Sequence, residues 1–243
     1  MFNLKNTFAA AALSLAAFGS ANASVVVLDT FNYDTPVDIT DSTTDATAVS
    51  AVRPDINDFF ADVKYDLNLA ANGGFGGDVS AKTISVNDGF LRFESGSSVE
   101  SSLTLTYGEF VPQSQSSGTS LNLLNLGSSF YFDTVFLDAE EGFSVLVQVI
   151  DTNFNVSSFL DNQPVPYDEA DNGGAFRRST VGFNQFVGTA DFSDVGAVML
   201  TITSAGKAVD LTLAEFGVVP EPTTLAIFGL GLLGLGLSRR RQA

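Results

Sequence analysis

The chain has 243 residues, with 11 lysines and arginines against 28 aspartates and glutamates, a formal net charge of −17, and no histidine, cysteine or tryptophan. Without histidine and cysteine, a Ser-His-Asp triad, a Cys-His pair, an ordinary zinc site and a disulfide scaffold are all excluded. The acidic net charge repels nucleic acid, so we expect no nucleic-acid partner. Because no disulfide can form, we also expect the fold to depend on its apolar core.

The first 23 residues have the features of a secretory signal peptide. Lys5 supplies a positive start, residues 7–18 form an apolar run, and Ala21-Asn22-Ala23 gives the small-x-small pattern of a cleavage site. The alternative is an uncleaved anchor, but the apolar run is short for one. We therefore expect the mature chain to begin at Ser24.

Residues 24–217 form the predicted exported domain. Four basic residues (Lys5, Arg239, Arg240 and Arg241) and one acid (Glu221) lie outside it, which leaves 7 basic and 27 acidic residues and a net charge of −20. Direct binding to an acidic polysaccharide is therefore unfavourable unless a cation such as Ca²⁺ bridges the two.

Alternating apolar and polar residues, separated by turn signals, predict an all-β domain. Residues 53–71 fit a helix or a strand equally well. Asp88-Gly89 lies between two alternating runs and gives the best hairpin signal, because glycine accepts the positive φ of a tight turn. The elements expected in this half are a strand at 24–31, a loop at 33–47, a hairpin at 83–94 and a half-buried strand at 99–107.

The second half continues this pattern. Residues 143–151 are apolar on both faces, so we expect a central strand there, with residues 154–160 as its hairpin partner. Further strands are expected at 121–126, 130–137, 181–187 and 197–204, and a last hairpin is expected from 197–204 to 209–213. Together these elements predict an antiparallel β-sandwich of the jelly-roll-like type.

The longest predicted loop, residues 161–176, is the best candidate for a ligand or calcium site. It contains Asp161, Asp168, Glu169 and Asp171, and carboxylates are the ligands that Ca²⁺ prefers. Ala170 stands where a calcium-binding EF-hand loop would need an oxygen ligand, so no EF-hand is predicted. A solvated connector is the alternative, and we expect no other cofactor.

The last 26 residues combine three features in order. Val219-Pro220-Glu221-Pro222 is stiff and extended, because proline fixes φ and restricts the residue before it. Leu225 to Leu237 is then purely apolar, and as a helix it would span about 20 Å, short of a bilayer core of about 30 Å. Arg239, Arg240 and Arg241 follow, and they would hold the C-terminus in the cytoplasm.

This tail resembles the PEP-CTERM sorting signal of Gram-negative bacteria. The resemblance implies that residues 1–23 direct export, that residues 24–217 form the exported domain, and that residues 218–243 form the sorting signal with a single transmembrane helix. It also implies processing by exosortase near the Pro-Glu-Pro, with the precursor anchored in the inner membrane. Proteins of this kind accompany exopolysaccharide and biofilm production, so we expect a location at the cell surface or in the extracellular matrix.

We therefore expect a non-catalytic surface or matrix protein. One alternative is a glycan hydrolase that uses two carboxylates, since acids are plentiful. Another is an ice-binding protein, because this tail also occurs on such proteins and the chain holds Thr104-Leu105-Thr106 and Thr201-Ile202-Thr203. Two isolated Thr-x-Thr units are typical of the outward sides of ordinary amphipathic strands, whereas an ice-binding face needs a regular array.

Overall fold

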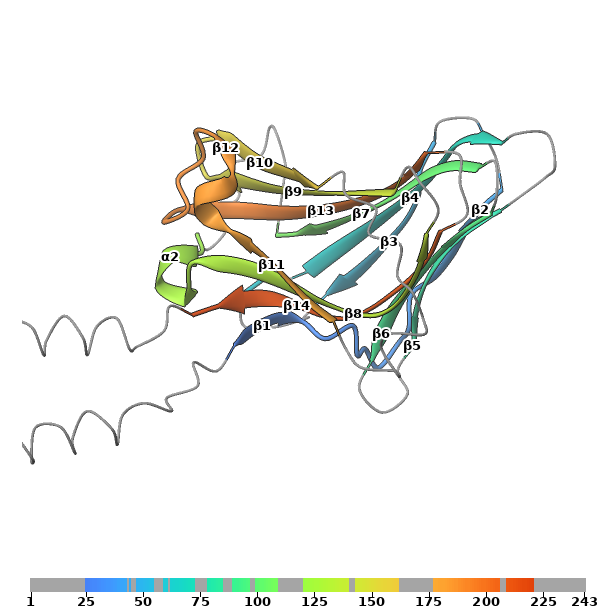
Figure 1. Cartoon of the computed structure of the whole chain (residues 1–243), viewed down its shortest axis with the longest axis horizontal. Helices are drawn as coiled ribbons and strands as arrows, with labels where there is room; N and C mark the ends of the chain where they lie inside the picture. The colour runs from blue at the N-terminus through green and yellow to red at the C-terminus, as the bar shows by residue number, and fades with distance from the viewer. Residues whose placement is uncertain are drawn as a thin grey trace, which may run out of the picture.

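Two antiparallel sheets pack face to face in this computed structural model (Figure 1). The all-β, two-sheet sandwich that the sequence predicts is therefore confirmed, while its jelly-roll-like order stays a prediction. The structure describes residues 25–42, 44, 47–54, 59–60, 62–72, 78–84, 89–96, 99–108, 120–139, 143–161, 177–205 and 209–220.

The first sheet has the strand order β11-β8-β14-β6-β5-β2, and β1 also pairs with β14. Strand β14 lies at its centre: β8 runs along one side, while β6 pairs with Val209–Leu213 and β1 pairs with Phe216–Val218 on the other. The strands are β1 (Val26–Asp29), β2 (Asp38–Asp41), β5 (Val79–Ile84), β6 (Phe90–Ser95), β8 (Ser129–Ala139), β11 (Arg177–Gly182) and β14 (Val209–Val219).

The second sheet has the order β12-β10-β9-β13-β7-β4-β3. Its strands are β3 (Val49–Pro54), β4 (Asp62–Asn72), β7 (Val99–Tyr107), β9 (Phe143–Asp151), β10 (Val156–Asp161), β12 (Val187–Gly188) and β13 (Val195–Ala205). A one-turn helix, α2 (Leu123–Leu126), and a 3₁₀ turn, η1 (Phe183–Gln185), lie at the end of the sandwich where β14 ends (Figure 1).

The core lies between the two sheets. Along β7, buried residues alternate with less buried ones, as a strand with one face in the core requires. Aromatic rings join the sheets: Phe216 of β14 stacks on Phe130 of β8 at 5.5 Å between ring centroids and on Tyr107 of β7 at 5.4 Å. The end of β14, which precedes the tail, is therefore part of the core.

Several predicted elements are confirmed. Strands β7 and β9 have the predicted bounds, and β9 lies inside its sheet, between β10 and β13. Strands β5 and β6 form the predicted hairpin, and Gly89 has a φ of 70°. The ambiguous residues 53–71 contain the end of β3 and most of β4.

Four predictions are wrong. Most of the strand predicted at 121–126 is α2 (Leu123–Leu126), because the Asn122 side chain accepts a hydrogen bond from the Asn125 N–H and caps the turn, while Leu121 forms only an isolated bridge with Val195. The predicted loop at 33–47 contains β2, where Asp41 is buried and accepts a hydrogen bond from the Leu69 N–H. The predicted strand at 181–187 is interrupted by η1. The predicted last hairpin does not exist, because β13 and β14 belong to different sheets.

The predicted signal peptide, including Ala21 and Ala23, lies outside the described residues, as do Glu221, Pro222, the apolar run from Leu225 to Leu237, and Arg239, Arg240 and Arg241. The transmembrane helix therefore stays a prediction. Within the part of the chain that the structure describes, no helix is long and apolar enough to cross a membrane.

Candidate functional site

The folded domain ends where the predicted sorting signal begins. Val219 is the last residue of β14 and pairs with Ser129, and its carbonyl accepts a hydrogen bond from the Ser128 N–H at 3.1 Å. Pro220 follows directly after the strand. Proline has no N–H to continue a strand ladder, which explains why the pairing stops there.

The predicted calcium loop cannot be assembled from the described residues. Asp161 is the last residue of β10 and is partly buried, whereas Asp168, Glu169 and Asp171 lie outside the described residues. Among the residues that the structure does describe, no group of three or more acids, histidines or cysteines is arranged to hold a metal ion. The calcium site therefore stays a prediction.

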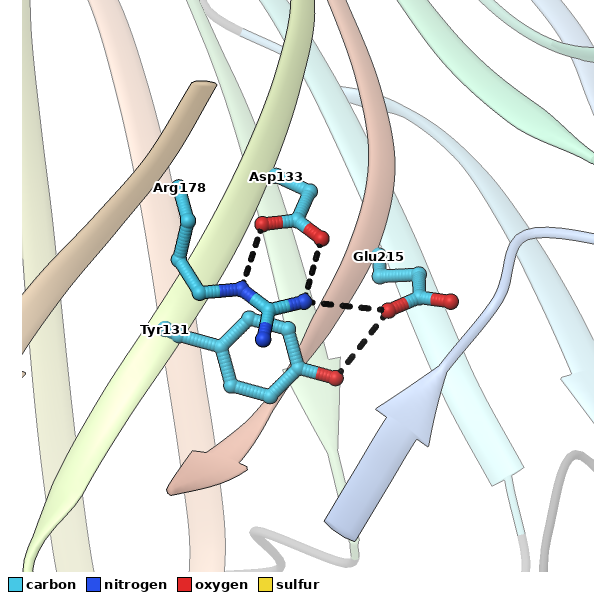
Figure 2. Close-up of polar contacts among 4 residues, drawn as sticks. All are labelled: Tyr131, Asp133, Arg178 and Glu215. Atoms are coloured by element: carbon cyan, nitrogen blue, oxygen red, sulfur yellow. Dashed lines mark hydrogen bonds and ion pairs between the residues drawn. The ribbon is translucent and has the colours of Figure 1, made fainter. Parts of the chain in front are cut away.

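Four side chains on the outer face of the first sheet form a polar cluster, made of Tyr131, Asp133, Arg178 and Glu215 (Figure 2). In the register, Arg178 on β11 lies opposite Asp133 on β8, and Asp133 lies opposite Glu215 on β14. Arg178 donates from Nε to Asp133 Oδ1 at 2.8 Å and from Nη2 to Asp133 Oδ2 at 2.6 Å, a bidentate pair. Its Nη2 also lies 3.7 Å from Glu215 Oε2.

Tyr131 contacts both Glu215 and Arg178. Its hydroxyl donates to Glu215 Oε2 at 3.2 Å, and the guanidinium carbon of Arg178 lies 4.1 Å from its ring centroid (Figure 2). The ring fits because residue 217 is glycine: a Cβ there would lie 2.6 Å from the ring and 2.3 Å from the Val26 carbonyl oxygen.

The cluster contains two carboxylates, and Arg178 forms an ion pair with each of them. Asp133 accepts two hydrogen bonds from Arg178, whereas Glu215 lies at ion-pair distance from it. The hydrogen bond to Asp133 raises the pKa of Arg178, so the cation is permanent. Burial and the charge of Glu215 also raise the pKa of Tyr131, which keeps its hydroxyl a donor. Arg178 therefore pairs with acids on β8 and β14.

A second cluster lies in the core. Asp29, the last residue of β1, is 4% exposed. Its Oδ1 accepts from the Phe31 N–H at 2.7 Å, and its Oδ2 accepts from the hydroxyls of Tyr33 at 2.7 Å and Tyr107 at 3.1 Å. The Tyr33 and Tyr65 hydroxyls are 2.8 Å apart. Because Tyr65 and Tyr107 come from β4 and β7, this cluster ties the first strand to the opposite sheet.

Burial has the largest effect on the protonation of this second cluster. It raises the pKa of Asp29 to about 6, although the hydrogen bonds from Tyr33, Phe31 and Tyr107 oppose the shift. Burial and then the charge of Asp29 raise the pKa of Tyr33, Tyr65 and Tyr107, so the three phenols stay protonated.

A third acid, Asp151, closes the turn between β9 and β10 and is 2% exposed. Its Oδ1 accepts from the N–H groups of Asn153 and Asn155, both at 2.9 Å. Its Oδ2 accepts from the Asn155 side-chain amide at 2.8 Å and from the Asp191 N–H at 3.1 Å. Burial disfavours the charged form, but these four hydrogen bonds outweigh it and lower the pKa of Asp151.

The two Thr-x-Thr units lie side by side on the second sheet. Thr201 of β13 is opposite Thr104 of β7, and their hydroxyls are 3.0 Å apart. The expectation that the units are isolated is therefore wrong. The neighbouring rows do not repeat the motif, because Thr106 lies opposite Met199 and Thr203 lies opposite Ser102.

Sequence reasoning missed the two buried aspartates and the polar cluster. Asp29 gave one usable signal, an acid at the end of an all-apolar strand, and Tyr33 four residues later is its donor. Asp133, Arg178 and Glu215 are far apart in the chain, so only the strand register reveals that they meet.

A family model described as the PEP-CTERM protein-sorting motif matches residues 218–241. The chain therefore carries the sorting motif that its Pro-Glu-Pro, apolar run and arginines suggest. The motif indicates an exported protein that exosortase sorts to the cell surface. No curated protein matches the chain in sequence.

Several solved structures are similar to the chain at low TM-scores. The family 11 carbohydrate-binding module of the cellulosomal cellulase Lic26A-Cel5E of Clostridium thermocellum has 7% identity and a TM-score of 0.41, covering 81% of this chain and 95% of that one. The agarase AgWH50C has 14% identity and a TM-score of 0.39, covering 60% and 24%. A family 12 xyloglucanase from Bacillus licheniformis has 10% identity and a TM-score of 0.37, covering 71% and 99%. At these scores, none of the similarities supports an argument about this chain.

Proposed function

We propose that this protein is an exosortase-sorted surface or matrix component of a Gram-negative bacterium, with a β-sandwich that binds or supports other matrix components and catalyses no reaction. Its tail anchors the precursor in the inner membrane until exosortase cuts it, and the released domain then joins the exopolysaccharide outside the cell.

One observation carries this proposal: the sorting motif at residues 218–241 begins at the end of β14. Phe216 and Val218 are fully buried, whereas Pro220 has left the strand. A cut beyond Pro220 therefore removes the tail and keeps every strand of the sandwich. This arrangement is typical of a removable membrane anchor attached to a completely folded domain.

The state of the acids supports a non-catalytic domain. A hydrolase with two carboxylates needs one acid with a raised pKa facing a substrate cleft. Asp29 has the raised pKa, but it is 4% exposed and both of its oxygens accept hydrogen bonds. Asp133 and Glu215 are nearer the surface, and Arg178 holds both. Neither arrangement offers a proton to a bound glycan.

Epitope tags at the two ends of the mature chain test the sorting. One tag follows Ala23 and the other follows Ala243. In cells that contain exosortase, we expect the N-terminal tag on a soluble, shortened protein and the C-terminal tag in the membrane fraction. Exchanging Pro220 and Pro222 for alanine is the processing-deficient control, and it should keep both tags in the membrane. Both tags on one full-length secreted chain would contradict the proposal.

Binding is tested with the processed protein. Exopolysaccharide from the producing cells, with and without Ca²⁺, is the appropriate probe, since the net charge of −20 disfavours anionic polymers unless a cation bridges them. Retention of the protein on the polymer, with no release of shorter sugars, is the expected result. Release of reducing ends would support the hydrolase alternative instead.

A further inference from the structure

The chain enters and leaves the sandwich at the same end. Val26 is the first residue of β1, and it lies opposite Val218, the penultimate residue of β14. The Val219 carbonyl accepts from the Ser128 N–H, and the Ser128 carbonyl accepts from the Phe183 N–H at 2.8 Å. Figure 1 shows α2 beside the tip of β14. We call this surface the tail-proximal end, made of Val26, residues 122–129, residues 182–185 and Val219.

We propose that the tail-proximal end lies against the lipid bilayer while the precursor is anchored. The proposal depends on the proposed function, because it requires the apolar run of the tail to be in the membrane. The sorting motif concerns only the tail. The proposal adds that a surface of the folded domain contacts phospholipid.

The length of the tether supports this orientation. Only residues 220–224 separate Val219 from Leu225, and five residues span at most about 18 Å when fully extended. Strand β14 has 11 residues, and at about 3.3 Å per residue it is roughly 36 Å long. The tether is shorter than β14. It therefore cannot let the far end of the sandwich, where β14 begins, reach the membrane in place of the tail-proximal end.

The other end of the chain imposes a similar limit before the signal peptide is removed. Seven residues, 19–25, separate the apolar run that ends at Phe18 from Val26, and they span at most about 25 Å. Since Val26 pairs next to the exit of β14, both membrane-directed segments hold the same end of the domain. Two short tethers at one end oppose tilting more strongly than one.

The charge distribution supports a lipid partner. Residues 120–130 and 179–190 contain no aspartate, glutamate, lysine or arginine, although residues 24–217 carry a net charge of −20. Leu124 of α2 is 56% exposed. Bilayers with anionic lipids repel the acidic flanks of the sandwich, so an uncharged end with an exposed leucine is the surface that can approach most closely.

An acidic turn sets the boundary of this surface. Asp151, Asp191 and Asp194 lie where β13 begins, and Leu121, just before α2, pairs with Val195 there. This turn precedes β13 of the second sheet and contacts one side of α2, because the Leu123 N–H donates to the Phe192 carbonyl at 2.9 Å. We therefore place the exit of β14 and the side of α2 with the exposed Leu124 against the bilayer, with the acidic turn at the edge of this surface.

Single nitroxide labels test the proposal, because the chain has no cysteine and each label can be placed alone. The full chain is reconstituted into vesicles of phosphatidylethanolamine and phosphatidylglycerol without exosortase. Labels are attached at Leu124→Cys and Asn184→Cys in the tail-proximal end, and at Glu100→Cys as the control. Glu100 is exposed and lies opposite Ala205, at the other end of the second sheet. A fourth label at Leu232→Cys reports on the tail.

We expect the ratio of collisions with oxygen to collisions with a water-soluble nickel chelate to be several-fold higher at Leu124 and Asn184 than at Glu100, with the highest ratio at Leu232. A lipid-like ratio at Leu232, with Leu124 and Asn184 no different from Glu100, would overturn the proposed surface and leave the anchor intact. A water-like ratio at Leu232 would overturn the anchored precursor itself, and the orientation with it. A higher ratio at Glu100 than at Leu124 would mean that the domain lies the other way up.

Discussion

Two aspartates at the ends of strands show how differently one side chain can be buried. Asp29 and Asp151 are 4% and 2% exposed, and each accepts at least three hydrogen bonds. Nevertheless, the pKa of Asp29 is raised to about 6, whereas that of Asp151 is lowered. The donors explain the difference.

Asp151 is held by three backbone N–H groups and one amide, in a turn at the edge of the sandwich. Asp29 is held by one N–H and two phenols, which can also donate to other acceptors, and it lies deep between the sheets. A carboxylate surrounded by fixed N–H groups in a turn is stabilised as an anion. A carboxylate in the core loses its hydration, and its few hydrogen-bond donors do not compensate for that loss. The same substitution should therefore have opposite consequences at the two sites.

Asp151→Asn should have the largest effect, a loss of about 3 kcal/mol in the free energy of unfolding at neutral pH. The amide group of asparagine would face the Asn155 amide or backbone N–H groups, so two donors would meet. Because the folded-state pKa is lowered, the stabilisation by Asp151 is present above the unfolded pKa of about 3.8 and disappears as the pH falls below it. Urea melts at several pH values measure this.

The control is Asp78→Asn, which removes one exposed charge just before β5. It corrects for the general relief of repulsion in an acidic domain. A variant Asp151→Asn as stable as Asp78→Asn would mean that the turn does not depend on the carboxylate, and the comparison with Asp29 would fail.

Asp29→Asn should act in the opposite direction with pH. The raised pKa means that the folded state favours the protonated acid, so the contribution of Asp29 to stability is greatest below the unfolded pKa and is lost as the pH rises through about 6. Asparagine cannot ionise. Its stability relative to wild type should therefore increase by about 2 kcal/mol between about pH 4.5 and pH 8.

The pH dependence of the difference between the two proteins is the decisive measurement, because it does not depend on how well an amide fits among Tyr33, Tyr65 and Tyr107. A constant difference across this range would show that Asp29 is ionised as easily in the folded chain as in the unfolded one.

Tyr107→Phe sharpens the comparison by removing one donor from Asp29. We expect a loss of about 1 kcal/mol, since one hydrogen bond to a buried acid disappears. The pKa of Asp29 should rise further, so the decline in stability should extend to higher pH. Tyr131→Phe is the matched control, because Tyr131 also donates to a carboxylate but Arg178 is present there. Equal pH profiles for the two variants would contradict the idea that the ion pair with Arg178 distinguishes the Tyr131 site from the Asp29 site.

The sequence predicts the sandwich well where periodicity is local. Strands β7 and β9 follow from alternation within nine residues, and the β5–β6 hairpin follows from one Asp-Gly turn. It fails where a cap or a distant partner determines the structure. Asn122 caps an apolar run that becomes α2, and pairing with β5 makes the mostly polar residues 38–41 a strand.

Which sheet a strand joins is not a local property either. Gly206-Lys207 looks like a tight turn, but β14 crosses to the other sheet, where β8, β6 and β1 surround it. The buried acids were missed for the same reason, since Asp29 meets Tyr107 only through the packing of the two sheets. The sorting motif was found because its three parts are contiguous in the chain.

Arg178→Gln should have the smallest effect on the free energy of unfolding. It tests how much the arginine, compared with solvent, stabilises Asp133 and Glu215. The Arg178 side chain is 40% exposed and that of Glu215 is 35% exposed, whereas that of Asp133 is 11% exposed. Water therefore reaches the guanidinium and Glu215, and it replaces part of what the ion pairs supply. We expect a loss of about 1 kcal/mol or less, decreasing further in high salt. Arg92→Gln is the control, because its pair with Glu94 has both side chains about half exposed and should contribute almost nothing. A loss at Arg178 as large as that of Asp151→Asn, and insensitive to salt, would mean that the solvent around the guanidinium does not compensate the buried Asp133 for the lost partner. Fixed hydrogen-bond donors, and not exposure to water, would then account for the stability of both the Asp133 site and the Asp151 site.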